Sequence, residues 1–141
     1  TVVDFYRGTD TQVVVKRHAY CNSFVVQKTL DELSRSGDIE ISSNSIHELI
    51  SDAQIVFTVN SGVGFESLLH MKPVIVSGDC DYSYAVKTVK SGAELKMILG
   101  RGIPVVNRAK VEKFLAFYQN NYAVESSNLE KIVARIDQWL G

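Results

Sequence analysis

The stretch from Thr58 to Gly78 constrains the fold more than any other part of the chain. Its sequence, TVNSGVGFESLLHMKPVIVSG, reads as the end of an apolar strand, a Ser/Gly turn, a short helix and a second apolar strand. The turn leads directly into the N-terminus of the helix, with no bulky side chain in the way. Backbone N–H groups at such a terminus can bind an anion, most often a phosphate. The stretch therefore predicts a strand–turn–helix–strand unit and a candidate anion site.

Short apolar runs alternate with amphipathic patterns along the rest of the chain. We expect strands at residues 12–16, 38–42, 55–59 and 73–77, and helices at 1–9, 23–37, 45–51, 62–70, 93–99, 108–122 and 128–140. Strands that alternate with helices, and that are apolar on both faces, are typical of a parallel sheet covered on both sides. We therefore expect residues 1–141 to form one Rossmann-like α/β domain, with helices on both faces of its parallel sheet and a helical C-terminal third.

Local signals support several of these boundaries. Ser23 can cap the helix that Gly37 ends, and Ser45 with Glu48 forms a capping box. The two C-terminal helices are expected to present apolar faces made of Val111, Leu115, Tyr118 and Tyr122, and of Leu129, Ile132, Val133, Ile136 and Leu140.

Composition narrows the function classes. A chain of 141 residues that is 45% hydrophobic can bury one ordinary core, and its net charge of −1 gives no support for a nucleic-acid surface. No apolar run reaches the roughly 18–20 residues that span a bilayer. Cys21 and Cys80 have no CxxC spacing, so we expect neither a disulfide framework nor a zinc site, and a cytoplasmic setting is the default. The chain opens on Thr1 inside a helix-like pattern, and we expect a fragment of a longer protein.

Polar side chains follow three of the predicted strands. They are Lys16-Arg17-His18, Asn60-Ser61-Gly62 and Ser77-Gly78-Asp79. Ligands of open α/β sheets bind beyond the carboxyl ends of the strands. If the strands are parallel, the three groups share one edge, and this convergence carries the functional hypothesis.

The turn and its helix offer a phosphate site and a hydroxyl site. Ser61 stands where an N-cap hydroxyl would be, and Gly62 and Gly64 allow close approach to the backbone; close packing of the helix on the strand explains the glycines equally well. Glu66 follows Ser61 by five residues, roughly 7–8 Å along the helix. That spacing suits a nucleoside phosphate with its ribose at the carboxylate, and the alternative is a solvated glutamate.

The three histidines lie in different sequence contexts. His18 can donate to a phosphate or protonate a leaving phosphate, with Lys16 and Arg17 countering the charge; the alternative is a set of solvated surface residues. His47 and His70 lie on short helices without a recognisable partner spacing, and we interpret both as structural.

The loop after the second strand of this stretch is acidic and aromatic. Asp79, Asp81 and Tyr82 suit a turn, and the alternative is that they close over a base or sugar. Cys21 and Cys80 are expected to be small core or loop residues.

The block 60–69, NSGVGFESLL, with Lys72-Pro73-Val74 and Gly78, resembles the donor-site block of capsule polysaccharide biosynthesis proteins. These are Kdo-transferase-like and bacterial sialyltransferase-like enzymes with the GT-B fold. Residues 13–18, VVVKRH, resemble their Lys-x-His-Pro segment. The resemblance covers roughly residues 12–82 and implies the C-terminal, donor-binding half of a GT-B fold.

The resemblance also implies roles for individual residues. The nucleotide phosphate would be held by His18, the catalytic candidate, together with Lys16 and the turn at residues 61–64 (Ser61, Gly62, Val63 and Gly64), and the ribose by Glu66. Two positions depart from the family pattern: Ala19 replaces the proline after the histidine, and Gly62 replaces a second hydroxyl residue. Without that hydroxyl, the amides of Gly62 and Val63 would have to hold the phosphate.

The resemblance implies that the ligand is a nucleotide sugar, CMP-linked donors included. It also implies that no cofactor is needed, and the GxGxxG pattern of dinucleotide-binding sites is absent from the sequence. A missing N-terminal domain would bind the glycan acceptor and supply the catalytic base, so the isolated chain is not expected to transfer sugar. The expected location is the cytoplasm, including the periphery of the inner membrane, with no nucleic acid partner and no membrane span. Two alternatives stay open: a GT-B-fold sugar-nucleotide 2-epimerase domain and a non-enzymatic α/β binding module.

Overall fold

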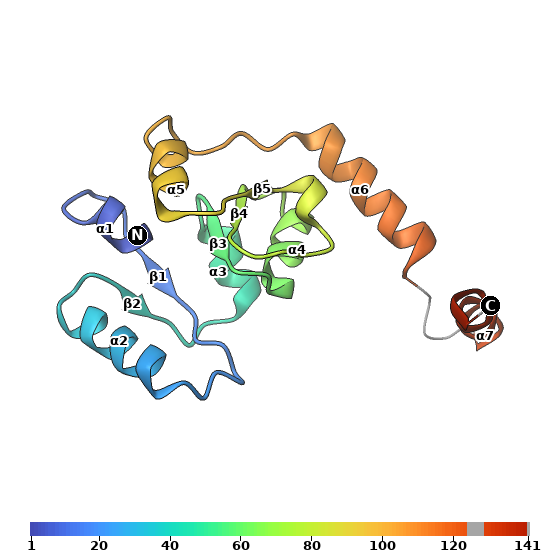
Figure 1. The fold of residues 1–141 in the computed structure, drawn as a ribbon, viewed down its shortest axis with the longest axis horizontal. Coiled ribbons are helices and arrows are strands. Elements are labelled where there is room, and N and C mark those ends of the chain that lie inside the picture. Colours follow the sequence, from blue (N-terminus) through green and yellow to red (C-terminus); the bar gives the residue numbers. More distant parts are fainter. Residues whose placement is uncertain (124–128, 141) are drawn as a thin grey trace. The chain divides into compact units, whose positions relative to one another are not determined.

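The computed structural model describes residues 1–123 and 129–140, which divide into two compact units. The first unit is Thr1–Val105, and it contains every strand described below. The second unit is Val106–Gly141, and its described part is helical. Figure 1 shows the elements of each unit.

The first unit alternates strands and helices, as the sequence predicts. Its elements in order are α1 (Val2–Tyr6), β1 (Val14–Val15), α2 (Phe24–Arg35), β2 (Glu40–Ile41), α3 (Ile46–Asp52), β3 (Val56–Thr58), α4 (Gly62–Leu69), β4 (Val74–Val76), the 3₁₀ turn η1 (Ser83–Ala85), β5 (Lys87–Thr88) and α5 (Gly92–Leu99). The α/β class is confirmed. Strand β5 was not predicted, because Lys87 and Thr88 form no apolar run.

The strands form two small parallel sheets instead of the single sheet expected. In the first, β1 pairs with β2, with Val14 opposite Glu40. In the second, the order is β3-β4-β5, with Phe57 opposite Ile75 and Ile75 opposite Lys87. Within the described residues no ladder joins the two sheets. The carboxyl ends of β3 and β4 therefore share an edge, whereas β1 ends in the other sheet.

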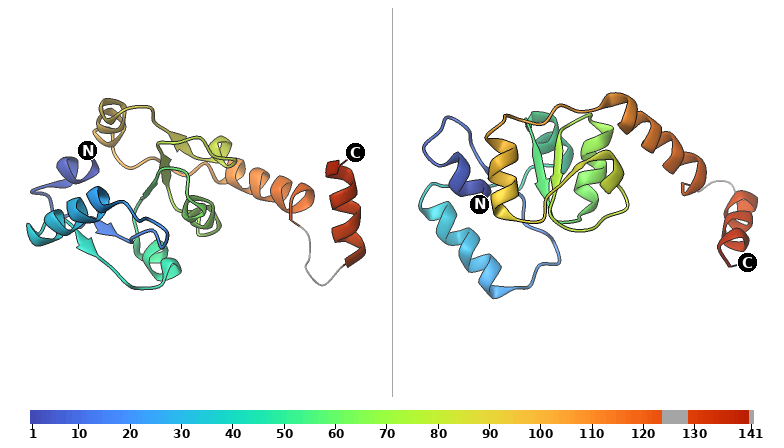
Figure 2. Two further views of the ribbon diagram at one scale, coloured as in Figure 1. Left: turned by 60° about the horizontal axis from the view of Figure 1, so that its bottom comes forward. Right: turned by 45° about the horizontal axis from the view of Figure 1, so that its top comes forward.

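The second sheet is covered on both faces, as predicted. Ile75 packs with Leu95 and Leu99 of α5, and helix α1 adds Val2 and Phe5 to the same cluster. Val74 and Val76 point to the opposite face because side chains alternate along a strand. Helix α4 packs there against β3 and β4, and the right view of Figure 2 shows α4 and α5 on either side of the strands.

The predicted helix caps are present. The Ser23 hydroxyl accepts the Val26 amide at 3.4 Å, and Gly37 after α2 has a φ of +78°. Ser45 and Glu48 form the expected capping box at the start of α3. These signals are local, so they are visible in the sequence before any packing is known.

The second unit contains α6 (Arg108–Asn121) and α7 (Leu129–Leu140). The most buried residues of α6 are Val111 and Phe114, and Phe114 was missing from the predicted face. Tyr122, which was included, is 52% exposed because it lies at the C-cap, beyond the last turn. In α7, the predicted apolar residues Leu129, Val133 and Ile136 are exposed. Asn128, where this helix was predicted to begin, and the Leu140 side chain lie outside the described residues.

In the part of the chain that the structure describes, no helix is both long and apolar enough to cross a membrane.

Candidate functional site

The turn between β3 and α4 is built by hydrogen bonds around Ser61. Its amide donates to Thr58 Oγ1 at 3.3 Å, and its hydroxyl accepts the Val63 amide at 3.3 Å. The Gly64 amide donates to the Ser61 carbonyl at 2.9 Å. Among the amides of residues 61–64, only that of Gly62 has no partner in the described structure. The Val63 amide is held by a long bond, which an anion with better geometry can displace.

The two glycines of the turn have different surroundings. A Cβ placed on Gly62 meets nothing within 4 Å, so this position faces open space. A Cβ on Gly64 would lie 2.5 Å from the hydroxyl oxygen and 2.8 Å from Cζ of Tyr82. The packing explanation therefore holds for Gly64. It does not hold for Gly62, whose open side is free to admit a ligand.

Tyr82 supports the turn through a hydrogen bond from its buried side chain. Its side chain is 2% exposed, and its hydroxyl donates to the Ser61 carbonyl at 2.5 Å. Burial raises the pKa of the Tyr82 phenol, with Cys80 adding to the effect, so the group stays a hydrogen-bond donor. The side chain is therefore not available to close over a ligand. This support was not predictable from local sequence patterns, because it depends on a contact across 21 residues.

The ends of β3 and β4 lie side by side. The Ser77 amide donates to the Thr58 carbonyl at 3.1 Å, and the Gly78 amide donates to the Val59 carbonyl at 2.8 Å. A Cβ on Gly78 would lie 3.0 Å from the same Val59 carbonyl oxygen. The second and third of the predicted polar strand ends therefore meet at one edge.

Glu66 lies on α4, below the turn, with a side chain that is 36% exposed. Its Oε2 atom is buried and has no hydrogen-bond partner. The exposed fraction therefore belongs to the rest of the side chain, which includes Oε1. A carboxylate oxygen buried without a donor typically costs on the order of 1–3 kcal/mol. The carboxylate retains its capacity to accept hydrogen bonds from a ligand.

His47 and His70 contact each other, although their spacing along the chain does not indicate a pair. His70 Nε2 lies 3.4 Å from His47 Nδ1, and the two rings stack with centroids 5.6 Å apart. His47 Nε2 lies 3.9 Å from Glu66 Oε2. The pairing arises because α3 packs on α4, which the spacing along the chain does not show. Within residues 1–123 and 129–140, no three His, Cys, Asp or Glu side chains are grouped to hold a metal ion.

The segment after β1 makes contacts of its own. Lys16 Nζ donates to the carbonyl oxygen of Asn44 at 2.5 Å and to that of Ser43 at 3.3 Å. Arg17 forms an ion pair with Asp31 of α2, so its charge is already compensated. Both cations of this segment therefore have protein partners.

His18 is exposed, and its Nδ1 accepts the Tyr20 amide at 3.2 Å. The other ring nitrogen, Nε2, then carries the proton of the neutral ring and can donate to a ligand. Among the described residues, no hydrogen bond or ion pair joins residues 16–18 to the turn at Ser61. The shared role of His18 and Ser61 in one site stays a prediction.

The acidic loop has the character of a turn. The Ser83 hydroxyl donates to the Cys80 carbonyl at 2.6 Å, and Asp79 forms an exposed ion pair with Lys90 at 3.0 Å. Cys21 and Cys80 are free thiols.

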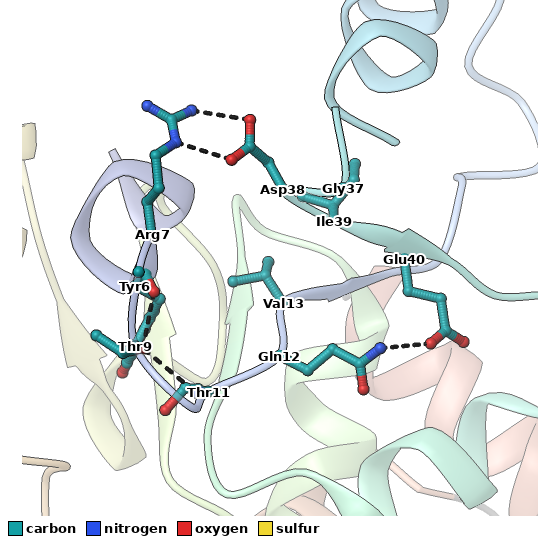
Figure 3. Close-up of a pocket in the computed structure, with 11 residues that line it drawn as sticks. Tyr6, Arg7, Thr9, Thr11, Gln12, Val13, Gly37, Asp38, Ile39 and Glu40 are labelled. Carbon is teal, nitrogen blue, oxygen red and sulfur yellow. Dashed lines mark hydrogen bonds and ion pairs between the residues drawn. The ribbon is translucent and has the colours of Figure 1, made fainter. Parts of the chain in front are cut away.

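A cavity of about 180 Å³ opens at the other end of the first sheet. Figure 3 shows Arg7 in a two-bond contact with Asp38, at 2.8 and 3.0 Å, and Gln12 donating to Glu40 at 2.7 Å. Arg7 and the Ser36 hydroxyl hold the pKa of Asp38 below its usual value. The cavity lies at the amino ends of β1 and β2, away from the predicted edge, and these polar groups satisfy one another. We therefore do not place the candidate site there.

Comparison with curated proteins and with solved structures finds no match. A family model described as "Capsule polysaccharide biosynthesis protein" matches residues 6–123, which include both sheets, the turn at Ser61, Glu66 and helix α6. The chain belongs to this capsule polysaccharide biosynthesis family.

Proposed function

We propose that this chain is the donor-binding domain of a glycosyltransferase in capsule polysaccharide biosynthesis, and that its ligand is a nucleotide sugar. Glu66 is the observation that carries the proposal. Its carboxylate follows the N-terminus of α4; Oε2 is buried without a hydrogen-bond partner in the described structure, and the side chain is 36% exposed, which leaves Oε1 to meet a ligand. Ribose offers two neighbouring hydroxyl donors, which suit a carboxylate.

The phosphate would lie at the start of α4. The Gly62 amide has no partner among the described residues, the Ser61 hydroxyl can donate, and the partial positive charge of the helix N-terminus favours an anion. The distance from this point to Glu66, roughly 7–8 Å along the helix, matches the separation of phosphate and ribose in one nucleotide.

The chemistry would be transfer of the sugar from phosphate to an acceptor hydroxyl. The bond between the anomeric carbon and the phosphate oxygen breaks, and negative charge develops on the departing phosphate. His18 Nε2–H would donate a hydrogen bond to that phosphate, and the Gly62 amide would stabilise its charge. The acceptor proton would go to a base outside this chain, so the isolated chain binds the donor without transferring the sugar.

Calorimetry of the 141-residue chain with CMP, UDP and GDP tests the proposal. We expect one of the three to bind, and Glu66→Ala to weaken that binding about tenfold or more, because it removes a charged acceptor. Glu32→Ala is the matched control, since Glu32 is an exposed helix glutamate on α2. The proposal is refuted if none of the three nucleotides binds, or if Glu66→Ala and Glu32→Ala lose the same amount of affinity.

The two alternative functions would give different experimental results. Deuterium incorporated at C2 of a nucleotide sugar by the full-length protein, in deuterated water and without acceptor, would identify a 2-epimerase. A protein that binds none of the nucleotides would fit a non-enzymatic module.

A further inference from the structure

We propose that His47, held by His70, is a positioning residue for Glu66, and that it sets the preference of the site for ribonucleotides over 2′-deoxynucleotides. The inference rests on the proposed function, because it concerns how the same carboxylate is aimed at the ribose. It is carried by a row of three side chains: His70 at the C-cap of α4, His47 on α3 and Glu66 on α4.

The row favours one tautomer of His47. The distance of 3.4 Å between His70 Nε2 and His47 Nδ1 requires one nitrogen to donate and the other to accept. When His70 donates, His47 Nδ1 is the acceptor, and the neutral ring carries its proton on Nε2. That N–H faces Glu66 Oε2, which is an acceptor and has no other donor. The opposite assignment would aim a lone pair at a carboxylate, which is repulsive.

The contact between His47 and Glu66 is longer than a hydrogen bond. The distance between Nε2 and Oε2 is 3.9 Å, so a small rotation of either side chain that closes about 1 Å brings it to hydrogen-bonding length. Occupied by His47, Oε2 would leave Oε1 to accept the ribose hydroxyls. A carboxylate held at one oxygen presents the other in a fixed direction, which favours a two-hydroxyl ligand over one that lacks the 2′-hydroxyl.

Other charged groups nearby have their own partners. Lys72 Nζ donates to the Ser51 carbonyl at 2.7 Å, and Lys16 is bonded to the carbonyls before α3. Glu48, beside His47 on α3, accepts the Ser45 amide at 3.2 Å. Among the described residues, His47 is the ionisable group that faces Glu66.

The row also differs from a metal site. His47 directs Nδ1 towards His70 and Nε2 towards Glu66, so its two nitrogens serve two different neighbours. Ligands of one metal ion would instead converge on a common point, and the described residues hold no such group.

The first test measures how strongly the chain prefers a ribonucleotide to its 2′-deoxy analogue. Calorimetry gives the affinity ratio of CMP to 2′-deoxy-CMP, and likewise for the UDP and GDP pairs, in buffer with EDTA. We expect the unmodified chain to prefer the ribonucleotide about tenfold or more, because one hydrogen bond to a charged group is lost. His47→Leu should reduce the ratio to about threefold or less, whereas His47→Gln, whose amide nitrogen replaces Nε2 as donor, should retain it. An unchanged ratio in His47→Leu, or equal loss in both variants, would overturn the inference.

The second test does not need a ligand. Two-dimensional ¹⁵N NMR of the histidine side chains reports which ring nitrogen carries the proton. We expect His47 to be in the Nε2–H form, and His70→Leu to produce a mixture of forms. An Nδ1–H form of His47 in the unmodified chain would overturn the inference. If no nucleotide binds, the proposed function fails and the ribose preference fails with it, while the NMR result still tests the tautomer of His47 that the inference requires.

Discussion

Replacing each glycine of the turn by alanine, which adds one methyl group, is expected to affect the stability of the protein very differently at the two positions. In Gly64→Ala, the new Cβ would lie 2.5–2.8 Å from the Tyr82 hydroxyl oxygen and ring, closer than real Cβ atoms approach their neighbours. Tyr82 is 2% exposed, so the new Cβ must shift this buried ring or displace α4 from it. In Gly62→Ala, the same atom meets nothing within 4 Å.

The expected cost follows from these contacts. Overpacking a core typically costs about 1–3 kcal/mol. Loss of the bond from the Tyr82 hydroxyl to the Ser61 carbonyl leaves buried polar groups unpaired, for about 1–3 kcal/mol more. Alanine recovers about 0.5–1 kcal/mol as a better helix former. We therefore expect Gly64→Ala to lower the free energy of unfolding by about 2–4 kcal/mol. Gly62→Ala should change it by less than about 1 kcal/mol.

Urea unfolding followed by far-UV circular dichroism measures both variants. Tryptophan fluorescence is unsuitable, because the single tryptophan, Trp139, belongs to the second unit. The double variant Gly64→Ala/Tyr82→Phe separates the two contributions. It should remain destabilised, because ring carbons of Tyr82 would still lie 2.7 and 2.8 Å from the new Cβ. If Gly64→Ala is as stable as Gly62→Ala, Tyr82 does not support the turn and the packing argument is refuted.

Two further predictions concern the phosphate site and the first sheet. Gly62→Ser places a hydroxyl in open space beside the free amide, so nucleotide affinity in calorimetry should rise about threefold to tenfold without loss of stability; unchanged affinity would contradict a phosphate at this position. Folding lowers the pKa of Asp38 through Arg7 and Ser36, so its stabilisation is present above the usual carboxyl range and is lost as pH falls through the lowered pKa, below about pH 4. Asp38→Asn should reduce the acid-side slope of unfolding free energy against pH, and an unchanged slope would show that the Arg7 contact is not maintained in solution.

Features that depend on neighbouring residues were predictable from the sequence. Ser23 and Ser45 cap helices through amides three residues away, and the apolar run at residues 74–76 forms the strand buried on both faces. Such patterns are local, so they survive whatever the tertiary packing turns out to be. The same holds for Gly37, whose positive φ ends α2.

Features created by packing were not predictable in this way. β5 consists of Lys87 and Thr88, and its strand character comes from its pairing with β4. The role of Gly64 depends on Tyr82, and the role of His47 depends on Glu66, with each pair brought together by packing of the chain. A capping box at residues 45–48 predicts that α3 begins there, but not that its first turn faces α4. Ser61 and Glu66 were placed on one helix correctly because both are read from a single local pattern.

Helix α3 links the two parts of the candidate site. Lys16, which follows β1, bonds to the Asn44 carbonyl just before α3, and Lys72, which precedes β4, bonds to the Ser51 carbonyl in its last turn. The start of the helix is thus attached to a segment of the first sheet, and its end to a segment of the second. His47 of this helix faces Glu66. No ladder joins β1 to β3 in the described structure, and these two bonds of α3 connect the segment that carries His18 with the sheet that carries the turn. It follows that a nucleotide held by both His18 and Glu66 would depend on α3 as much as on either sheet.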